Sequence, residues 1–453
     1  MLTGYKVSTP INRYENNILD MYQNDKDDET QEISKFPLNP IEFQKLIDDF
    51  MDDPVNAISP IIELAQHYHF LISHDFFIVL LQMLVNNENV ESVLHLLNII
   101  SKFPESFWID QFPNELVPLL SDNFIHYPET LTILTSLIHY QQMEKLFLNF
   151  DILSKLEINL NSSNNSAFLI SIINFYKEAA KCRIAFYYDF ITIYYNISKL
   201  VKSNENNDNL RNISIETTYL YIKGFIHVHR IKEMEKIPFY SEILEWINIQ
   251  NNDLFFRIKL LKIIRLFTRQ KKLLKFVDVT TILPFLLSSL SLINEKQTFI
   301  VLCSIYNILR EGKKFSFTLI NSSFNLLTEL FNIYNRYGFT IQKEAIYVMI
   351  EYIIYFDSAE MYSFLQNSEL ISIFCDFLHT RTDDPDLLTD LLLCFINIYE
   401  AFEKDGKLPL LIPYFANDEF LQAIYELEEI KPYHYNRFKK KISSLLDMVS
   451  TNS

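Results

Sequence analysis

An apolar helical pattern that returns eight times constrains this chain more than any other feature. Each copy is eight residues long and mostly apolar, as in LHLLNIIS at 94–101 and LCFINIYE at 393–400. The fifth residue of each copy serves here as its marker, and successive markers are 38, 38, 50, 41, 42, 44 and 46 residues apart: Asn98, Ser136, Asn174, Gly224, Arg265, Asn307, Glu351 and Asn397. Such regularity predicts a row of similar helical units.

The length of the interval indicates a class of architecture. A period of about 40–47 residues with two or three helices per unit is typical of armadillo and HEAT arrays. Stacked units share one continuous core, so 453 residues need not divide into separate globules. We predict an all-α fold, an armadillo/HEAT-like right-handed α-solenoid of about eight to nine repeats. We expect an acidic, disordered tail over 1–38, the repeat array with its caps over 39–449, and a short tail over 450–453.

Composition agrees with a helical array. Hydrophobic residues make up 49% of the chain and aromatic residues 15%, which is enough to fill an extended interior. Only five of the 453 residues are glycine, far below the average glycine content of about 7%. Glycine-rich phosphate loops are therefore not expected. Helices are predicted at 75–85 and 90–103, and the second has apolar positions around more than one face, as a helix packed on both sides requires.

Short polar segments between the apolar runs predict where helices begin and end. Pro40 is expected in the first helical turn of the array. The run at 186–200 is assigned to a helix because it is too long for a typical strand. The string EGKK at 311–314 is interpreted as a helix end. The segment 415–449, which contains RFKKK at 437–441, is predicted to be a C-terminal cap with a polar outer face.

Net charge and cysteine usage restrict partners and compartment. A net charge of −17 argues against direct nucleic-acid binding. The same charge favours a basic protein or peptide partner, or serves only to keep a long apolar array soluble. The cysteines are far apart, so no disulfide is expected and a cytoplasmic and/or nuclear location is predicted. They are Cys182, Cys303, Cys375 and Cys394. All but Cys375 lie in strongly apolar stretches and are expected to be small buried hydrophobes.

Neither the N-terminus nor any apolar run predicts a membrane segment. The first residues lack the apolar core of a signal peptide. The longest uncharged run, 279–293, is shorter than the ~20 apolar residues that a span needs.

No string of residues indicates catalysis or metal binding. The histidine pairs 67/69 and 227/229 are two residues apart, so on a helix they point away from each other. The adjacent carboxylates Asp48-Asp49 and Glu428-Glu429 are expected to be solvated. We expect no enzyme activity, no metal and no cofactor.

One cluster of basic residues interrupts the acidic chain. It could dock the acidic residues 24–32 or form a solvated ridge, and its members are Arg257, Lys259, Lys262, Arg265, Arg269, Lys271, Lys272 and Lys275.

The span 338–449 resembles the C-terminal repeats of importin-alpha, the armadillo adaptor for nuclear import. The matching stretches are TIQKEAIYVMIEYII at 340–354, SFLQNSELISIFCDFL at 363–378, DDPDLLTDLLLCFINIYEAFEK at 383–404 and YELEEI at 425–430. In that family, asparagines on successive inner helices clamp the backbone of an extended basic peptide, and tryptophans one turn earlier hold its lysine stems. The resemblance places the clamps at Asn98, Asn174, Asn307 and Asn397. Hydrogen bonds within the stack are the other reading of these amides.

The chain departs from the family at the tryptophans and at the N-terminus. The residues one turn before the markers include no Trp: Leu94, Thr132, Ile170, Leu220, Leu261, Cys303, Tyr347 and Leu393. The N-terminal segment is acidic rather than arginine-rich. We therefore expect a non-catalytic scaffold that binds a protein or an extended, basic peptide, as a divergent importin-alpha-like adaptor for nuclear import. The alternative is a general armadillo/HEAT scaffold in a trafficking, cytoskeletal or signalling complex.

Overall fold

A computed structural model describes most of the chain beyond its N-terminal segment. The described residues are 40–123, 125–140, 146–147, 149–163, 165–182, 190–203, 207–227, 234–249, 253–269, 271–290, 294–366, 369–380 and 384–452. Over these ranges every regular element is a helix and no strand occurs. The all-α prediction is confirmed. The predicted tail over 1–38, the acidic residues 24–32 and His229 lie outside the described residues.

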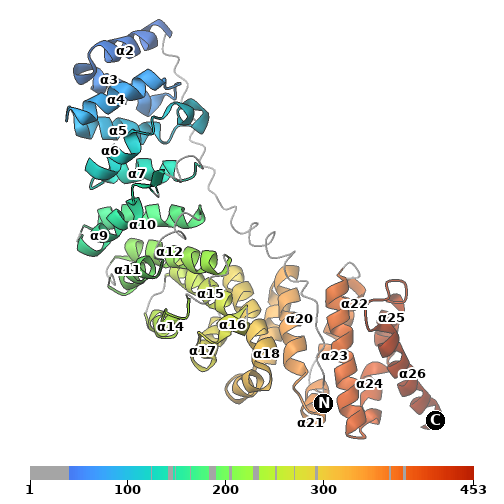
Figure 1. Cartoon of the computed structure of the whole chain (residues 1–453). Coiled ribbons are helices and arrows are strands. Elements are labelled where there is room, and N and C mark those ends of the chain that lie inside the picture. Colours follow the sequence, from blue (N-terminus) through green and yellow to red (C-terminus); the bar gives the residue numbers. More distant parts are fainter. Residues whose placement is uncertain are drawn as a thin grey trace. The chain divides into compact units, whose positions relative to one another are not determined.

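The described residues form two compact units, divided between Leu266 and Phe267. In the N-terminal unit (40–266) the helices follow one another in chain order (Figure 1). They are α2 (Pro40–Asp52), α3 (Pro54–His67), α4 (His74–Val85), α5 (Val90–Ile100), α6 (Leu116–Asn123), α7 (Pro128–Leu137), α9 (Ile152–Ser162), α10 (Ser166–Lys181), α11 (Phe190–Ser203), α12 (Asp208–His227), α14 (Phe239–Asn248) and α15 (Leu254–Thr268), within which the division falls. Helices α5, α7, α10 and α12 pack each against the next.

The C-terminal unit (267–452) is built in the same way. Its helices are α16 (Lys271–Leu274), α17 (Val279–Leu290), α18 (Glu295–Ser323), α19 (Leu326–Arg336), α20 (Phe339–Ile353), α21 (Ser358–Gln366), α22 (Leu370–Thr380), α23 (Pro385–Lys404), α24 (Ile412–Phe415), α25 (Asp418–Glu426) and α26 (Tyr435–Asn452). Helices α18, α20, α23 and α26 pack each against the next. Within the described ranges, no helix has both the length and the apolar character that crossing a membrane requires.

The eight copies of the sequence pattern lie one in each of eight helices. These helices are α5, α7, α10, α12, α15, α18, α20 and α23. Their apolar residues are buried around most of the circumference; in α5, for example, the buried residues include Val93, Leu94 and Leu96. The prediction of helices packed on both sides is confirmed. Each of these helices leaves only a narrow stripe partly exposed. Seven of the eight markers lie on this stripe, and the exception, Arg265, is buried.

Asparagine and aspartate begin the helices without the help of glycine. Asn165, Asn294 and Asp384 each accept a backbone N–H of the first helical turn, from Phe168, Gln297 and Leu387 respectively. This satisfies N–H groups that have no partner inside the helix. Helix α2 begins at Pro40, as predicted.

The predicted helix end at 311–314 is wrong, because α18 continues to Ser323. The continuation is held by tertiary contacts that a local pattern does not contain. Phe317 is buried and its ring centroid lies 5.0 Å from that of Tyr352 on α20. The Tyr352 hydroxyl donates to Asn321 Oδ1 at 3.1 Å. Packing against α20 therefore outweighs the cost of about 1 kcal/mol for a glycine inside a helix, here Gly312.

An aromatic cluster joins the last helices of the C-terminal unit. Phe395 of α23 has its ring centroid 5.1 Å from that of Phe420 and 5.6 Å from that of Phe438. On α26, one face is buried through Tyr435, Phe438, Ile442 and Leu445. From the RFKKK segment, Arg437 donates to Glu400 at 2.6 Å, and Lys440 is exposed. The last helix therefore presents one apolar and one polar face, as a terminal cap should.

Candidate peptide-binding surface

The four predicted clamp residues all lie on the partly exposed stripe, which we call the marker stripe: the seven partly exposed markers together with the half-buried residues near them on the same helices. Asn98 on α5 and Asn174 on α10 belong to the N-terminal unit, and Asn307 on α18 and Asn397 on α23 belong to the C-terminal unit. Each side chain is half-buried. Within the described residues, the buried Oδ1 of Asn98 has no hydrogen-bond partner. For Asn98, the alternative that the amide is held by hydrogen bonds within the stack is therefore not supported.

Contacts between neighbouring marker helices recur at the interval of the sequence pattern. Cys303 Sγ lies 3.4 Å from Glu344 Oε2, and the two residues are 41 positions apart. Lys343 and Asp384 form an ion pair at the same separation of 41. These two contacts therefore join α18 to α20 and α20 to the start of α23, each one repeat apart.

In the N-terminal unit, charged residues of the stripe form ion pairs with one another. Glu216 of α12 lies between Lys177 of α10 and Lys259 of α15, at N–O distances of 3.5 and 2.5 Å. Burial of the Glu216 carboxyl tends to raise its pKa, but the hydrogen bond and charge of Lys259, with those of Lys177, outweigh burial and lower the pKa. These carboxylate and ammonium groups already have partners.

In the C-terminal unit the stripe carries paired tyrosines. The rings of Tyr306 on α18 and Tyr347 on α20 have centroids 5.8 Å apart. Arg310 lies over the Tyr306 ring at 6.0 Å, and Lys343 lies over the Tyr347 ring at 5.8 Å. In both contacts a cation of the protein itself lies over a half-buried tyrosine ring, which is a favourable cation–π arrangement.

Two half-buried carboxyls lie near these rings, and burial raises the pKa of both. The pKa of Glu351 on α20 is raised to about 7, chiefly by burial, with Arg310 opposing the increase and Asp390 and Glu311 adding to it. Burial, together with Asp386, raises the pKa of Asp390 on α23 to about 6, again against Arg310. One guanidinium thus faces several carboxyls, and the surface would be stabilised by further positive charge.

The acidic and aromatic members of this surface were not predicted as site residues. In the sequence, Glu351 stands out only as a marker of the repeat, and Tyr347 only as the residue one turn before that marker. Asp390 carries a recognisable signal, because it interrupts the apolar run LLTDLLLCF of α23. A charged residue inside so apolar a helix must lie on its exposed stripe or have a partner.

The predicted basic cluster does not form one solvated ridge. Lys262 and Arg265 are each only 8% exposed, and the Lys262 ammonium lies 5.8 Å from the centroid of the Tyr219 ring. Lys271 and Lys272 are exposed, and they belong to the C-terminal unit, whereas Lys262 and Arg265 belong to the N-terminal unit. The cluster therefore divides between two helices, with the buried Lys262 and Arg265 on α15 and the exposed Lys271 and Lys272 on α16.

Other candidate chemical groups have structural explanations. No group of three or more His, Cys, Asp or Glu among the described residues could hold a metal ion. The His69 ring packs 4.6 Å from the Phe103 ring, centroid to centroid. Both Asp48-Asp49 and Glu428-Glu429 are exposed, as predicted. Cys182 differs from its prediction, because it is half-buried and hydrogen-bonded rather than a buried apolar group.

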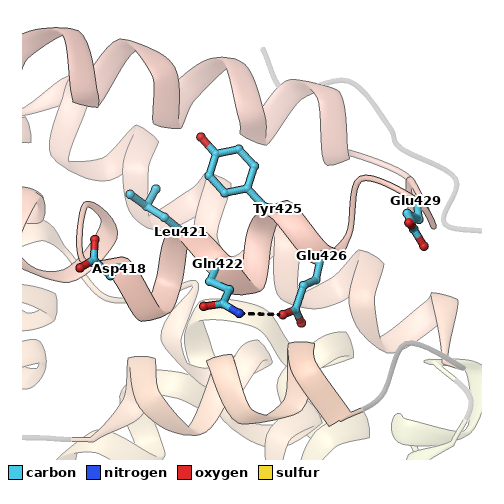
Figure 2. Close-up of a pocket in the computed structure, with 6 residues that line it drawn as sticks. All are labelled: Asp418, Leu421, Gln422, Tyr425, Glu426 and Glu429. Carbon is cyan, nitrogen blue, oxygen red and sulfur yellow. Dashed lines mark hydrogen bonds between the residues drawn. The ribbon is translucent and has the colours of Figure 1, made fainter.

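A shallow hollow lies along α25 (Figure 2). Gln422 Nε2 donates to Glu426 Oε1 at 3.2 Å, and Glu426 also lies 2.6 Å from His379 Nδ1. The hollow is open to solvent and its lining comes from α25 and the turn after it: Asp418, Leu421, Gln422, Tyr425, Glu426 and Glu429. An open surface of this kind does not exclude water from a reacting group, so it does not suit catalysis.

Comparisons with known proteins support the fold and leave the function open. No family model and no curated protein matches the chain. A crystal structure of an engineered protein from the Northeast Structural Genomics Consortium matches with a TM-score of 0.57 and 13% identity, covering 90% of this chain and 99% of that one. A second engineered protein from the consortium covers 55% of this chain and 97% of its own, with a TM-score of 0.41 and 12% identity. At this identity, the first match shows a shared fold alone.

Proposed function

We propose that this protein is a non-catalytic armadillo-type α-solenoid of about eight to nine repeats that binds an extended basic peptide on its marker stripe. The observation that carries the proposal is the surface of α18, α20 and α23. There, half-buried carboxyls with raised pKa values lie beside tyrosine rings and asparagine amides.

Each component of that surface has a role toward such a peptide. A lysine or arginine side chain between Glu351 and Asp390 would offset the cost of burying their negative charge. The rings of Tyr306 and Tyr347 would pack against its aliphatic stem and attract its charge. The amides of Asn307 and Asn397 can both donate to and accept from a peptide backbone. Tyr347 stands one turn before its marker, the position at which importin-alpha carries tryptophan.

The finer form of the proposal is a divergent importin-alpha-like adaptor for nuclear import, located in the cytoplasm, the nucleus or both. Its support is the sequence resemblance over 338–449, which spans α20 to α26. The other proposal is a general armadillo/HEAT scaffold for whole protein domains. Exposed Tyr425 (58%) beside the hollow of α25 favours that reading, because a large exposed aromatic side chain suits a protein interface.

Asparagine variants test the peptide-clamp role. The probe is a fluorescein-labelled decapeptide of alternating lysine and alanine, and fluorescence anisotropy measures its binding to the full chain. Replacing Asn307 and Asn397 together by Ala is expected to weaken binding about fivefold to 150-fold, because each of the two lost hydrogen bonds costs about 0.5–1.5 kcal/mol.

The matched control is Asn335→Ala, since Asn335 is an exposed asparagine on α19 of the same unit. Its binding should equal that of the wild-type protein. Equal affinities for all three proteins would remove the asparagines from the site. A wild-type protein that does not bind the probe at all would favour the domain scaffold.

A further inference from the structure

A cysteine, a histidine and a glutamate meet where two marker helices end in the N-terminal unit. Cys182 is the residue that follows α10, and His139 lies in the turn after α7. Cys182 Sγ lies 3.0 Å from His139 Nδ1, and His139 Nε2 lies 3.3 Å from Glu178 Oε2. The imidazole thus bridges a thiol and a carboxylate, one through each ring nitrogen.

The environment of Cys182 differs from that of the other three cysteines. Cys182 is half-buried, and the His139 side chain beside it is 45% exposed. Cys303, Cys375 and Cys394 are buried. Burial raises the pKa of the Cys375 thiol to about 12, and burial also raises the pKa of Cys394. Those three thiols are shielded by burial, whereas Cys182 combines access with a neighbouring base.

We propose that Cys182, His139 and Glu178 form an activated thiol, a site at which Cys182 is oxidised by peroxides. In this step the Glu178 carboxylate, 3.3 Å from Nε2 of His139, favours the tautomer with the ring proton on Nε2, and Nδ1 takes the thiol proton. The thiolate then attacks one oxygen of hydrogen peroxide, so that an S–O bond forms and the O–O bond breaks. The departing hydroxide takes the proton from the imidazolium and leaves as water. Sulfur is oxidised by two electrons to sulfenic acid, and the peroxide is reduced.

Two local electrostatic effects act on a Cys182 thiolate in opposite directions. The C-terminal end of α10 places partial negative charge near Cys182, which disfavours a thiolate. An adjacent imidazolium can lower the pKa of a cysteine well below its ordinary value, so the proposal requires the His139 ring to outweigh the helix end.

The position of the site connects it to the marker stripe. Asn174 and Glu178 lie on α10 and Cys182 directly follows it, at successive intervals of four residues, so the three lie along one side of this helix and its end. Oxidation would therefore add a polar group to the end of the surface that carries Asn174. The chemistry of the thiol does not depend on the proposed peptide binding and can be tested without it.

Alkylation rates of the folded full-length protein test the proposal. Iodoacetamide is added for timed intervals at about pH 6.5, well below the ordinary thiol pKa, and mass spectrometry follows each cysteine peptide. Cys182 is expected to react fastest of the four. His139→Gln should slow Cys182 at least about tenfold at that pH. The matched control His126→Gln, at an exposed histidine just before α7, should leave the rate unchanged.

A second readout follows peroxide directly. Wild-type protein is treated with hydrogen peroxide and then with dimedone, which labels sulfenic acid. Label is expected on Cys182, is expected to fall in His139→Gln, and should be absent from that peptide in Cys182→Ser. A Cys182 alkylation rate that is the same in wild type and His139→Gln would overturn the proposal. Dimedone label confined to other cysteines would do the same.

Discussion

A protein carrying both Glu351→Gln and Asp390→Asn is expected to bind the lysine–alanine decapeptide about tenfold to a hundredfold more weakly than wild type. Both carboxyls are half-buried, so water screens their attraction for a bound ammonium less than it would at an exposed site. The substitutions keep the size of the side chains and remove the charge, while one carboxylate oxygen becomes an amide NH2 donor. Fluorescence anisotropy at low and at moderate salt measures the change.

The pH dependence of peptide binding tests the same two carboxyls in a second way. Burial raises the pKa of Glu351 to about 7 and that of Asp390 to about 6, so both carboxyls are largely protonated in acid. A bound cation favours the ionised forms, so binding releases protons and affinity should rise from about pH 5.5 to about pH 7.5. The double variant should lose this rise.

A matched control separates the site from the general acidity of the chain. Asp48→Asn with Asp49→Asn also removes two negative charges, from exposed positions on α2. This protein should bind like wild type, apart from a small salt-dependent loss. Equal losses in the two double variants would mean that net charge alone attracts the peptide.

Phe395→Ala is expected to lower the free energy of unfolding of the C-terminal unit by about 3–5 kcal/mol. Phe395 is fully buried, and its ring contacts four others at centroid distances of 5.1 to 5.8 Å, those of Phe374, Phe415, Phe420 and Phe438. These rings join α22, α23, α24, α25 and α26, so one substitution opens a cavity shared by five helices. Urea denaturation followed by circular dichroism measures the loss.

Two other variants calibrate the stability measurement. Phe395→Leu should cost less, because it leaves a smaller cavity. Phe315→Ala removes a phenylalanine that is 62% exposed on α18 and should change stability by less than about 0.5 kcal/mol. If Phe395→Ala unfolded at the same urea concentration as Phe315→Ala, the aromatic cluster would not stabilise this unit.

The helices could be predicted because their signals are local. The eight copies of the apolar pattern each lie in a separate helix, and Pro40 begins α2 where a proline in the first turn was expected. The break between α4 and α5 was also predicted from four polar residues. Apolar periodicity and capping act within one or two turns, so a single sequence contains the information.

The surface chemistry could not be predicted because its partners are one repeat apart. The His139–Cys182 contact joins residues 43 positions apart, and the Cys303–Glu344 contact joins residues 41 apart. The pKa of Glu351 is raised chiefly by burial in the stack, against Arg310 and with Asp390, and these two residues lie on two other helices. The continuation of α18 past Gly312 likewise depends on α20. These groups come together only when neighbouring helices pack against each other in the folded chain.

Hydrogen–deuterium exchange of the full chain with and without the lysine–alanine decapeptide tests the central claim most directly. Exchange measured by mass spectrometry reports local opening of each helix, and a bound ligand suppresses opening where it makes contact. We predict slower exchange in the segments 303–311, 343–354 and 386–400, which carry the marker stripe of the C-terminal unit. Protection confined to α25 and α26, or spread equally over all acidic segments, would contradict binding on that stripe.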